Sequence, residues 1–148
     1  GPDRFDVILE KRILYVLSLG ALDMVNFGAL ETVPADFRDR LLHVHNPQVT
    51  LMRTTPAENA QFGEWIAEKL NRSTSPVTIL IPDGGVSALD APGMPFWNPE
   101  ANAALFEALT SGIKQSSDRK ISRLPYHIND PSFSAALVAE FLQLVKSN

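Results

Sequence analysis

Short apolar runs alternate with amphipathic segments along this 148-residue chain. Apolar runs rich in β-branched residues predict buried strands, and apolar residues three or four positions apart predict helices. Strands are expected at 13–19, 76–81 and 121–124, and helices at 5–12, near 35–42, and beginning at Pro56, Pro99 and Pro131. This alternation predicts an α/β fold, a small parallel, Rossmann-like sheet with helices on both faces.

Three helix starts carry explicit capping signals. Thr55 precedes Pro56 and stands three residues before Glu58, the spacing of a capping box. Asn98 and Asp130 precede prolines in the same way. A sheet of three or four strands is small, so we expect a missing segment or a partner chain to complete one edge.

Length and composition fit one domain with a real core. We expect a single α/β domain over residues 3–146, taken from a longer multidomain protein, with Gly1 and Pro2 as the scar of a cleaved tag. The formal net charge of -4 argues against direct nucleic-acid binding. The chain has no cysteine, which excludes thiolate catalysis and Cys-ligated metals, and it has no apolar run long enough to span a membrane. A cytoplasmic location is the default expectation.

The strongest candidate site follows the second predicted strand. Ile81 leads into a loop that contains Gly84, Gly85 and Ser87, where backbone N–H groups can approach an anion closely. The loop lacks the Gly-Lys-Ser/Thr of a phosphate-binding P-loop and the spacing of a dinucleotide fingerprint. It therefore places a candidate ligand site without naming the ligand.

Other polar residues follow predicted strand ends, where open α/β sheets gather their ligands. Asp23 and Asn26 either face a ligand or form a turn between two glycines. His127 precedes Asp130, which is either a partner of the imidazole or the cap of the last helix. A Ser-His-Asp arrangement of Ser87, His127 and Asp130 is supported by chain order alone.

An anion contact is also expected at the first capped helix. Arg53 and Thr54 precede its start, so a guanidinium and a hydroxyl meet the positive end of the helix dipole. The alternative is an ordinary cap beside a surface arginine. His43 and His45 alternate as metal ligands would on a strand, but structural histidines explain them better, and no metal site is predicted.

Several of these motifs occur together in one order: Arg4–Arg12, Gly20–Gly28, His45–Asn46, Leu51–Thr55, Gly85–Gly93 and Tyr126–Asp130. Together they resemble the family that includes the tomato mosaic virus resistance protein, and Phe5–Arg12 looks particularly like the plant members. The resemblance implies the C-terminal part of the second domain of a two-domain α/β module, which plant members follow with a TIM barrel.

What the resemblance implies about function is an ATP-binding type of module, with ATP and Mg²⁺ as cofactors. For the resistance protein it also implies binding to the helicase domain of a viral replication protein, which inhibits viral RNA replication. No catalytic residue is transferred by the resemblance.

The leading hypothesis is a binding domain for a nucleotide or another phosphorylated metabolite. Two alternatives stay open. One is a protein-interaction or dimerisation module without its own ligand, and a homo-oligomer is expected. The other is a hydrolase or lyase, metal-assisted or not, that uses His45, His127 and Asp90.

Overall fold

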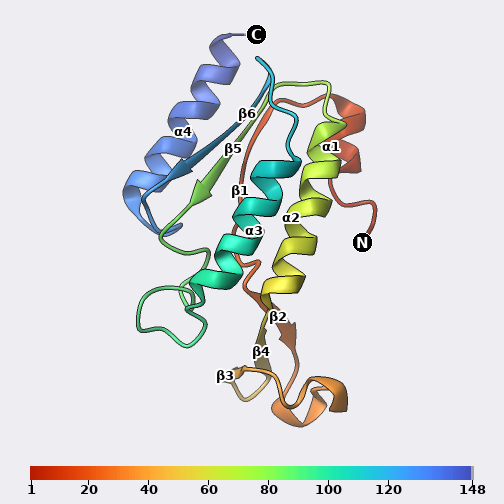
Figure 1. Cartoon of the computed structure of the whole chain (residues 1–148), viewed down its shortest axis with the longest axis vertical. Helices are drawn as coiled ribbons and strands as arrows, with labels where there is room; N and C mark the ends of the chain where they lie inside the picture. Colours follow the sequence, from red (N-terminus) through yellow and green to blue (C-terminus); the bar gives the residue numbers. More distant parts are fainter. Residues whose placement is uncertain (148) are drawn as a thin grey trace.

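Two separate three-stranded sheets organise the chain (Figure 1). The computed structural model describes residues 1–147. Its elements are, in chain order, α1 (Asp6–Lys11), β1 (Tyr15–Ser18), β2 (Met24–Phe27), two 3-10 turns (Leu30–Thr32 and Ala35–Phe37), β3 (Leu42–Asn46), β4 (Val49–Arg53), α2 (Pro56–Asn71), β5 (Val77–Pro82), α3 (Pro99–Gly112), β6 (Arg119–Leu124) and α4 (Pro131–Lys146).

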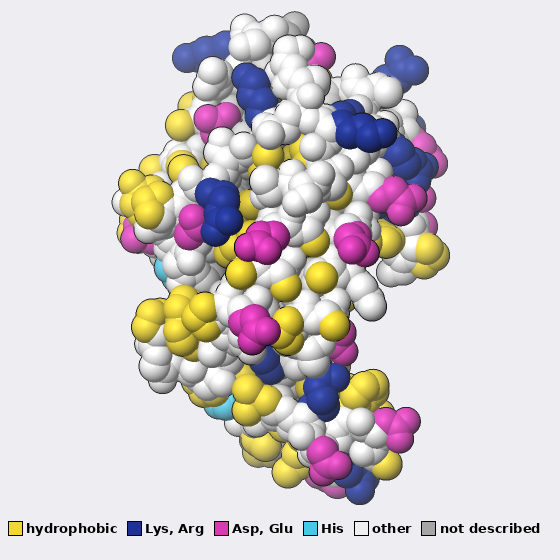
Figure 2. All heavy atoms as spheres, viewed as in Figure 1, with side chains coloured by type: hydrophobic (Ala, Val, Ile, Leu, Met, Phe, Trp, Pro, Cys, Tyr) yellow, Lys and Arg dark blue, Asp and Glu magenta, His cyan; other side chains and the backbone are white. Residues whose placement is uncertain are grey.

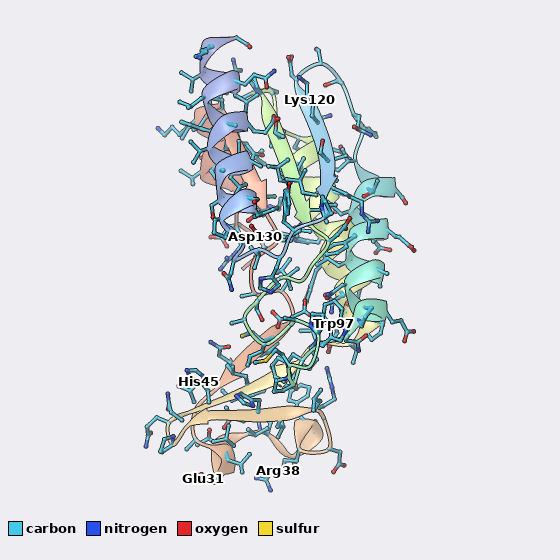
Figure 3. All side chains as sticks on the ribbon, turned by 90° about the vertical axis from the view of Figure 1, so that its left-hand side faces the viewer. Glu31, Arg38, His45, Trp97, Lys120 and Asp130 are labelled. Carbon is cyan, nitrogen blue, oxygen red and sulfur yellow. The ribbon has the colours of Figure 1, made fainter. Side chains whose placement is uncertain are left out.

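The first sheet is parallel, with strand order β1-β5-β6. Helices α2 and α3 pack together on one face, and α4 lies on the other face against β1 and β5 (Figures 1 and 3). The central strand β5 is buried along its whole length, as a run of apolar residues in a sheet covered on both faces must be. The predicted α/β fold, with a parallel sheet between helices, is confirmed.

The predicted caps are present at all three long helices. Thr55 and Glu58 form the full capping box of α2, with each side chain bonded to the other residue's backbone N–H. Asn98 accepts from the N–H of Ala101 at the start of α3, and Asp130 accepts from that of Ser132 at the start of α4. These bonds satisfy N–H groups that a helix cannot pair internally.

The second sheet is antiparallel, with strand order β2-β4-β3, and it projects from one end of the molecule (Figure 1). The helix predicted near 35–42 is wrong: only a 3-10 turn forms at Ala35–Phe37, and a strand begins at Leu42. Leu42 pairs with Met52 of β4, which is buried. Pairing with a segment ten residues further along overrides the weak local preference for helix at Leu42, whereas residues 38–40 form a turn and a bend.

The surface mixes charge and apolar area. On the face that shows α2 and α3, acidic and basic side chains are interspersed among exposed apolar atoms (Figure 2). No helix within residues 1–147 combines the length and apolar character needed to cross a membrane.

Candidate functional site

The carboxyl ends of the three parallel strands bring the predicted site segments together. The loop after β1 contains Asp23, the loop after β5 contains Gly84 to Ser87, and the loop after β6 contains His127. Backbone hydrogen bonds join these loops from Ala21 N–H to Val86 O (2.9 Å), from Gly84 N–H to Tyr126 O (2.9 Å) and from Ile128 N–H to Gly85 O (3.0 Å). Segments far apart in sequence therefore form one edge.

Gly84 and Gly85 are required by close backbone packing. A Cβ on Gly84 would lie 2.6 Å from the backbone nitrogen of His127, and one on Gly85 would lie 1.9 Å from the carbonyl oxygen of Asp90. Gly85 also has a φ of 126°, which side chains rarely adopt. The N–H of Gly85 donates to Pro82 O at 3.2 Å. Both glycine N–H groups thus have partners within the protein, and anion binding by them stays a prediction.

His127 braces the glycine loop. Its Nδ1 accepts from the N–H of Asn129 at 3.1 Å, so the ring proton belongs on Nε2, which donates to the carbonyl oxygen of Ser87 at 2.9 Å. The imidazole contacts the Ser87 backbone and not its hydroxyl, while Asp130 caps α4. The Ser-His-Asp arrangement suggested by chain order is therefore not formed.

Asp23 and Ser87 make a buried pair. The Ser87 hydroxyl donates to Oδ2 of Asp23 at 2.6 Å, and the Asp23 side chain is completely inaccessible to solvent. Its Oδ1 has no hydrogen-bond partner within the described residues. Burial raises the pKa of Asp23, against the opposing effects of the Ser87 hydrogen bond and the charge of Arg53.

Arg53 lies inside the protein rather than at an open anion site. Its side chain is 3% exposed and forms a salt bridge of 3.4 Å with Asp90. The guanidinium also donates to Phe96 O (2.8 Å), Thr54 Oγ1 (3.1 Å) and Asn102 Oδ1 (3.0 Å). It ties β4 to the loop after β5 and to α3. Direct contact of Arg53 with a ligand remains a prediction.

Thr54 extends this network towards α2. Its hydroxyl donates to Leu22 O at 2.8 Å and accepts from Nδ2 of Asn59 at 2.8 Å. Asn59 and Asn102 also belong to this network, and neither was predicted from the sequence. Their positions within the helices could have indicated them. Each asparagine occupies the buried stripe of its helix, seven residues before a core residue, namely Ile66 and Leu109.

Two further predicted residues lie outside this edge. Asn26 is exposed on β2, opposite Leu51. His45 is exposed on β3, and Figure 3 shows it on the antiparallel sheet, well away from Asp130. The structure therefore does not bring His45 to His127. Across residues 1–147, no three His, Asp or Glu side chains are grouped as a metal site would need.

A groove of about 510 Å³ opens beside the carboxyl end of β1. Its lining is mainly apolar and includes the rings of Phe62 and Trp65 from α2 together with Leu22. Gly20 forms part of its wall, and among the described residues Arg4 is the one charged side chain in the lining, which also includes the N-terminal Gly1. Arg4 is exposed, and no ion pair to it occurs within the described part of the chain.

Comparison with known proteins identifies close relatives of the chain. It is 56% identical over 139 residues to a UPF0261 protein of Rhizobium meliloti, and the match covers 94% of this chain but 35% of the relative. It is 52% identical to the ToMV resistance protein Tm-1 and 51% identical to the ToMV susceptible protein tm-1, both of Solanum lycopersicum. Each tomato match covers 95% of this chain and 19% of the relative.

The chain thus spans about a third of its bacterial relative and a fifth of the tomato proteins. The model of the C-terminal domain of the uncharacterised protein family UPF0261 matches residues 1–145, nearly the whole chain. The protein belongs to the UPF0261 family, and its match is to the C-terminal domain of that family.

Proposed function

We propose that this domain contributes to a binding site for a nucleotide or another phosphorylated metabolite, and that the ligand lies in the groove at the carboxyl end of β1. The observation that carries the proposal is the composition and place of this groove. It combines aromatic and aliphatic walls with the unpaired cation of Arg4. It also lies at the edge where open parallel sheets bind ligands.

The groove suits the two chemically different ends of such a ligand. A planar base would pack on the apolar wall of Phe62, Trp65 and Leu22, which buries area at little entropic cost. A phosphate would pair with the guanidinium of Arg4 in a charge-assisted hydrogen bond. ATP is the nucleotide that the family resemblance suggests for testing.

A dedicated Mg²⁺ site does not fit this groove. Among the residues that the structure describes, its lining includes no carboxylate, and Mg²⁺ prefers oxygen ligands of that kind. We do not place the phosphate at Gly84 and Gly85, because the N–H groups of both glycines are already bonded to carbonyl oxygens. We therefore place no metal ion in this groove.

The buried polar residues position the groove in this proposal. The Asp23–Ser87 pair and the imidazole of His127 hold the loops after β1 and β5 together. The network of Arg53 and Thr54 fixes the backbone around Leu22, a residue that lines the groove. Their expected effect on binding is indirect, through the shape of the wall.

Calorimetric titration with ATP, ADP and inorganic phosphate, each with and without Mg²⁺, tests the proposal. We expect Arg4→Gln to weaken ATP binding at least about tenfold, the loss of a charge-assisted contact. Arg12→Gln is the matched control, because Arg12 caps the carboxyl end of α1, whereas Arg4 lies in the turn before this helix, and Arg12 is outside the groove. Equal affinity in both variants, or no binding by this chain and by the full-length Rhizobium relative, would refute the proposal.

An antiviral role is a second candidate, favoured by the 52% identity to the tomato resistance protein. The partner would be the helicase domain of a viral replication protein. The identity to the susceptible protein is 51%, so overall similarity does not separate the two activities. Co-sedimentation of this chain with a ToMV helicase domain, compared with the susceptible protein, is the test, and absence of a complex would remove this candidate.

A further inference from the structure

The two outer strands of the parallel sheet differ sharply in composition. β6 carries Arg119, Lys120 and Arg123 within six residues, and charged side chains of this kind protect a sheet edge from unwanted pairing. β1 has the sequence Tyr-Val-Leu-Ser, without a charge, and all four residues are half-buried. The edge at β6 is built to meet water, whereas the edge at β1 is not.

The strand pairing shows which backbone N–H and C=O groups of β1 point away from β5. Tyr15 donates its N–H to Pro76 O at the start of β5, and successive residues of a parallel strand bond to opposite sides. Val16 and Ser18 therefore direct their N–H and C=O groups away from β5. These groups form a hydrogen-bonding edge that is ready to accept another strand.

Helix α4 also exposes apolar side chains next to β1. Val138, Phe141, Leu142 and Val145 are 59%, 45%, 51% and 49% exposed. Their spacing of three, four and seven residues places them on one stripe of α4. A groove of about 420 Å³ separates this stripe from β1 and is lined by Tyr15, Val16, Val138 and Phe141 among others.

The position of α1 indicates which direction a preceding strand would come from. The ring of Phe5 lies 5.9 Å from that of Trp65 in α2, and Asp6 is 2.6 Å from Lys69 of α2. Helix α1 therefore lies on the α2 side of the sheet, the side of the crossover from β1 to β5. About 98% of crossovers between parallel strands are right-handed. A strand that precedes α1 and is connected through it to β1 would therefore lie beside β1 on the side opposite β5.

We propose that the edge of β1 and the stripe of α4 form one docking surface for the chain segment that precedes this domain in longer UPF0261 proteins. The segment would add a strand parallel to β1 and cover the stripe with apolar side chains. About two-thirds of the Rhizobium relative lies outside the match. The matched model is that of the C-terminal domain, so the remaining sequence has room to precede it.

A second copy of the chain is the competing occupant. Two β1 strands related by a two-fold axis would pair antiparallel over only four residues. The right-handed crossover through α1 gives no reason for such pairing. The same crossover does give a reason for pairing with a preceding strand of the same polypeptide. We therefore assign the docking surface to that strand.

Amide hydrogen exchange tests the docking surface. In this chain alone, the N–H groups of Val16 and Ser18 should exchange quickly, whereas that of Leu17, which faces β5, should be protected. In the full-length Rhizobium relative, the amides aligned with Val16 and Ser18 should exchange at least about 100-fold more slowly, as interior ladder amides do. Fast exchange of these two amides in the full-length protein would overturn the proposal.

Variants of the full-length relative keep the test decisive even if the short chain does not fold. Aspartate at the position aligned with Phe141 should restore fast exchange of the two outward amides. The matched control is aspartate at the position aligned with Leu30, which is 49% exposed on the antiparallel side. Protection in this chain alone that rises with concentration, together with a dimer in sedimentation, would assign the surface to a second copy instead.

Discussion

At the scale of single residues, the candidate site contains a buried hydrogen-bond network with fewer basic than acidic side chains. Arg53, Asp23 and Asp90 are all buried, so one guanidinium faces two carboxyl groups. Asp90 accepts from the N–H of Val86 and from Nδ2 of Asn102, at 2.9 and 2.8 Å. Within residues 1–147, Asp23 has a single side-chain donor, the Ser87 hydroxyl. The two acids therefore differ in how well their charged forms are supported.

Removing Arg53 should be strongly destabilising. Arg53→Ala leaves Asp90 buried without its cation, and breaking a buried ion pair in this way costs about 3–5 kcal/mol of unfolding free energy. Urea unfolding measures the change. Arg72→Ala is the control, because the Arg72 side chain is 57% exposed and its ion pair with Asp6 is long, at 3.9 Å from Nη1 to Oδ1. The change in unfolding free energy for Arg72→Ala should stay within about 0.5 kcal/mol. A loss below about 1 kcal/mol for Arg53→Ala would contradict the role given to the network.

Asp23 should give the fold a pH dependence of its own. A carboxyl group whose pKa is raised on folding stabilises the fold fully at low pH, and that contribution is lost as the pH rises through the raised pKa. Asp23→Asn keeps the acceptor for Ser87 and removes the charge. The unfolding free energy of the variant minus that of the wild type should therefore increase from about pH 4 to pH 7. Asp39→Asn, at an exposed site, should show no such trend, and a flat difference for Asp23→Asn would exclude the argument.

At the scale of elements, local signals predicted the long helices well and the second sheet poorly. The capping residues of α2, α3 and α4 act within four residues of themselves, so the sequence alone reveals them. The strands β2, β3 and β4 are four or five residues long and are stabilised by pairing with one another. Short strands of this kind leave little periodic signal, which explains why the sequence did not reveal the antiparallel sheet.

The contact between α2 and α3 depends on Gly63. A Cβ at this position would lie 2.6 Å from the carbonyl oxygen of Leu105 and 2.8 Å from Cβ of Ala108. Gly63→Ala should therefore destabilise the fold by about 1–3 kcal/mol, although alanine favours an isolated helix. Thermal unfolding measures this, with Glu64→Ala at the exposed neighbouring position as control. A gain in stability for Gly63→Ala would show that the two helices can separate without cost.

At the scale of the whole molecule, the two sheets are joined by a few long side chains. Arg40 donates to Oε2 of Glu58 in α2 at 2.7 Å and to the carbonyl oxygen of Arg53 at 2.9 Å. Arg53 in turn reaches Phe96 and α3. These polar contacts attach the antiparallel sheet to the main body, together with the ring contact of His43 in β3 with the buried Phe96, at 6.1 Å between the ring centroids.

This division should appear in local stability. β5 is buried throughout, whereas the last three residues of β3 are exposed. Native-state hydrogen exchange should therefore show β3 amides opening at lower free energy than β5 amides, which should open only on global unfolding. Equal opening free energies in the two strands would mean that the two sheets unfold as one unit.

Local sequence was enough to predict the alternation of helices and strands, the helix starts and the place of the candidate loops, because each depends on residues close together in the chain. What those loops contact depends on the folding of distant segments against one another. This folding turned Arg53 and Thr54 inward, used the N–H groups of Gly84 and Gly85 for loop packing, and separated Asn26 and His45 from the parallel-sheet edge. Donors and acceptors from strands far apart in sequence satisfy one another there, and no local pattern records such pairing.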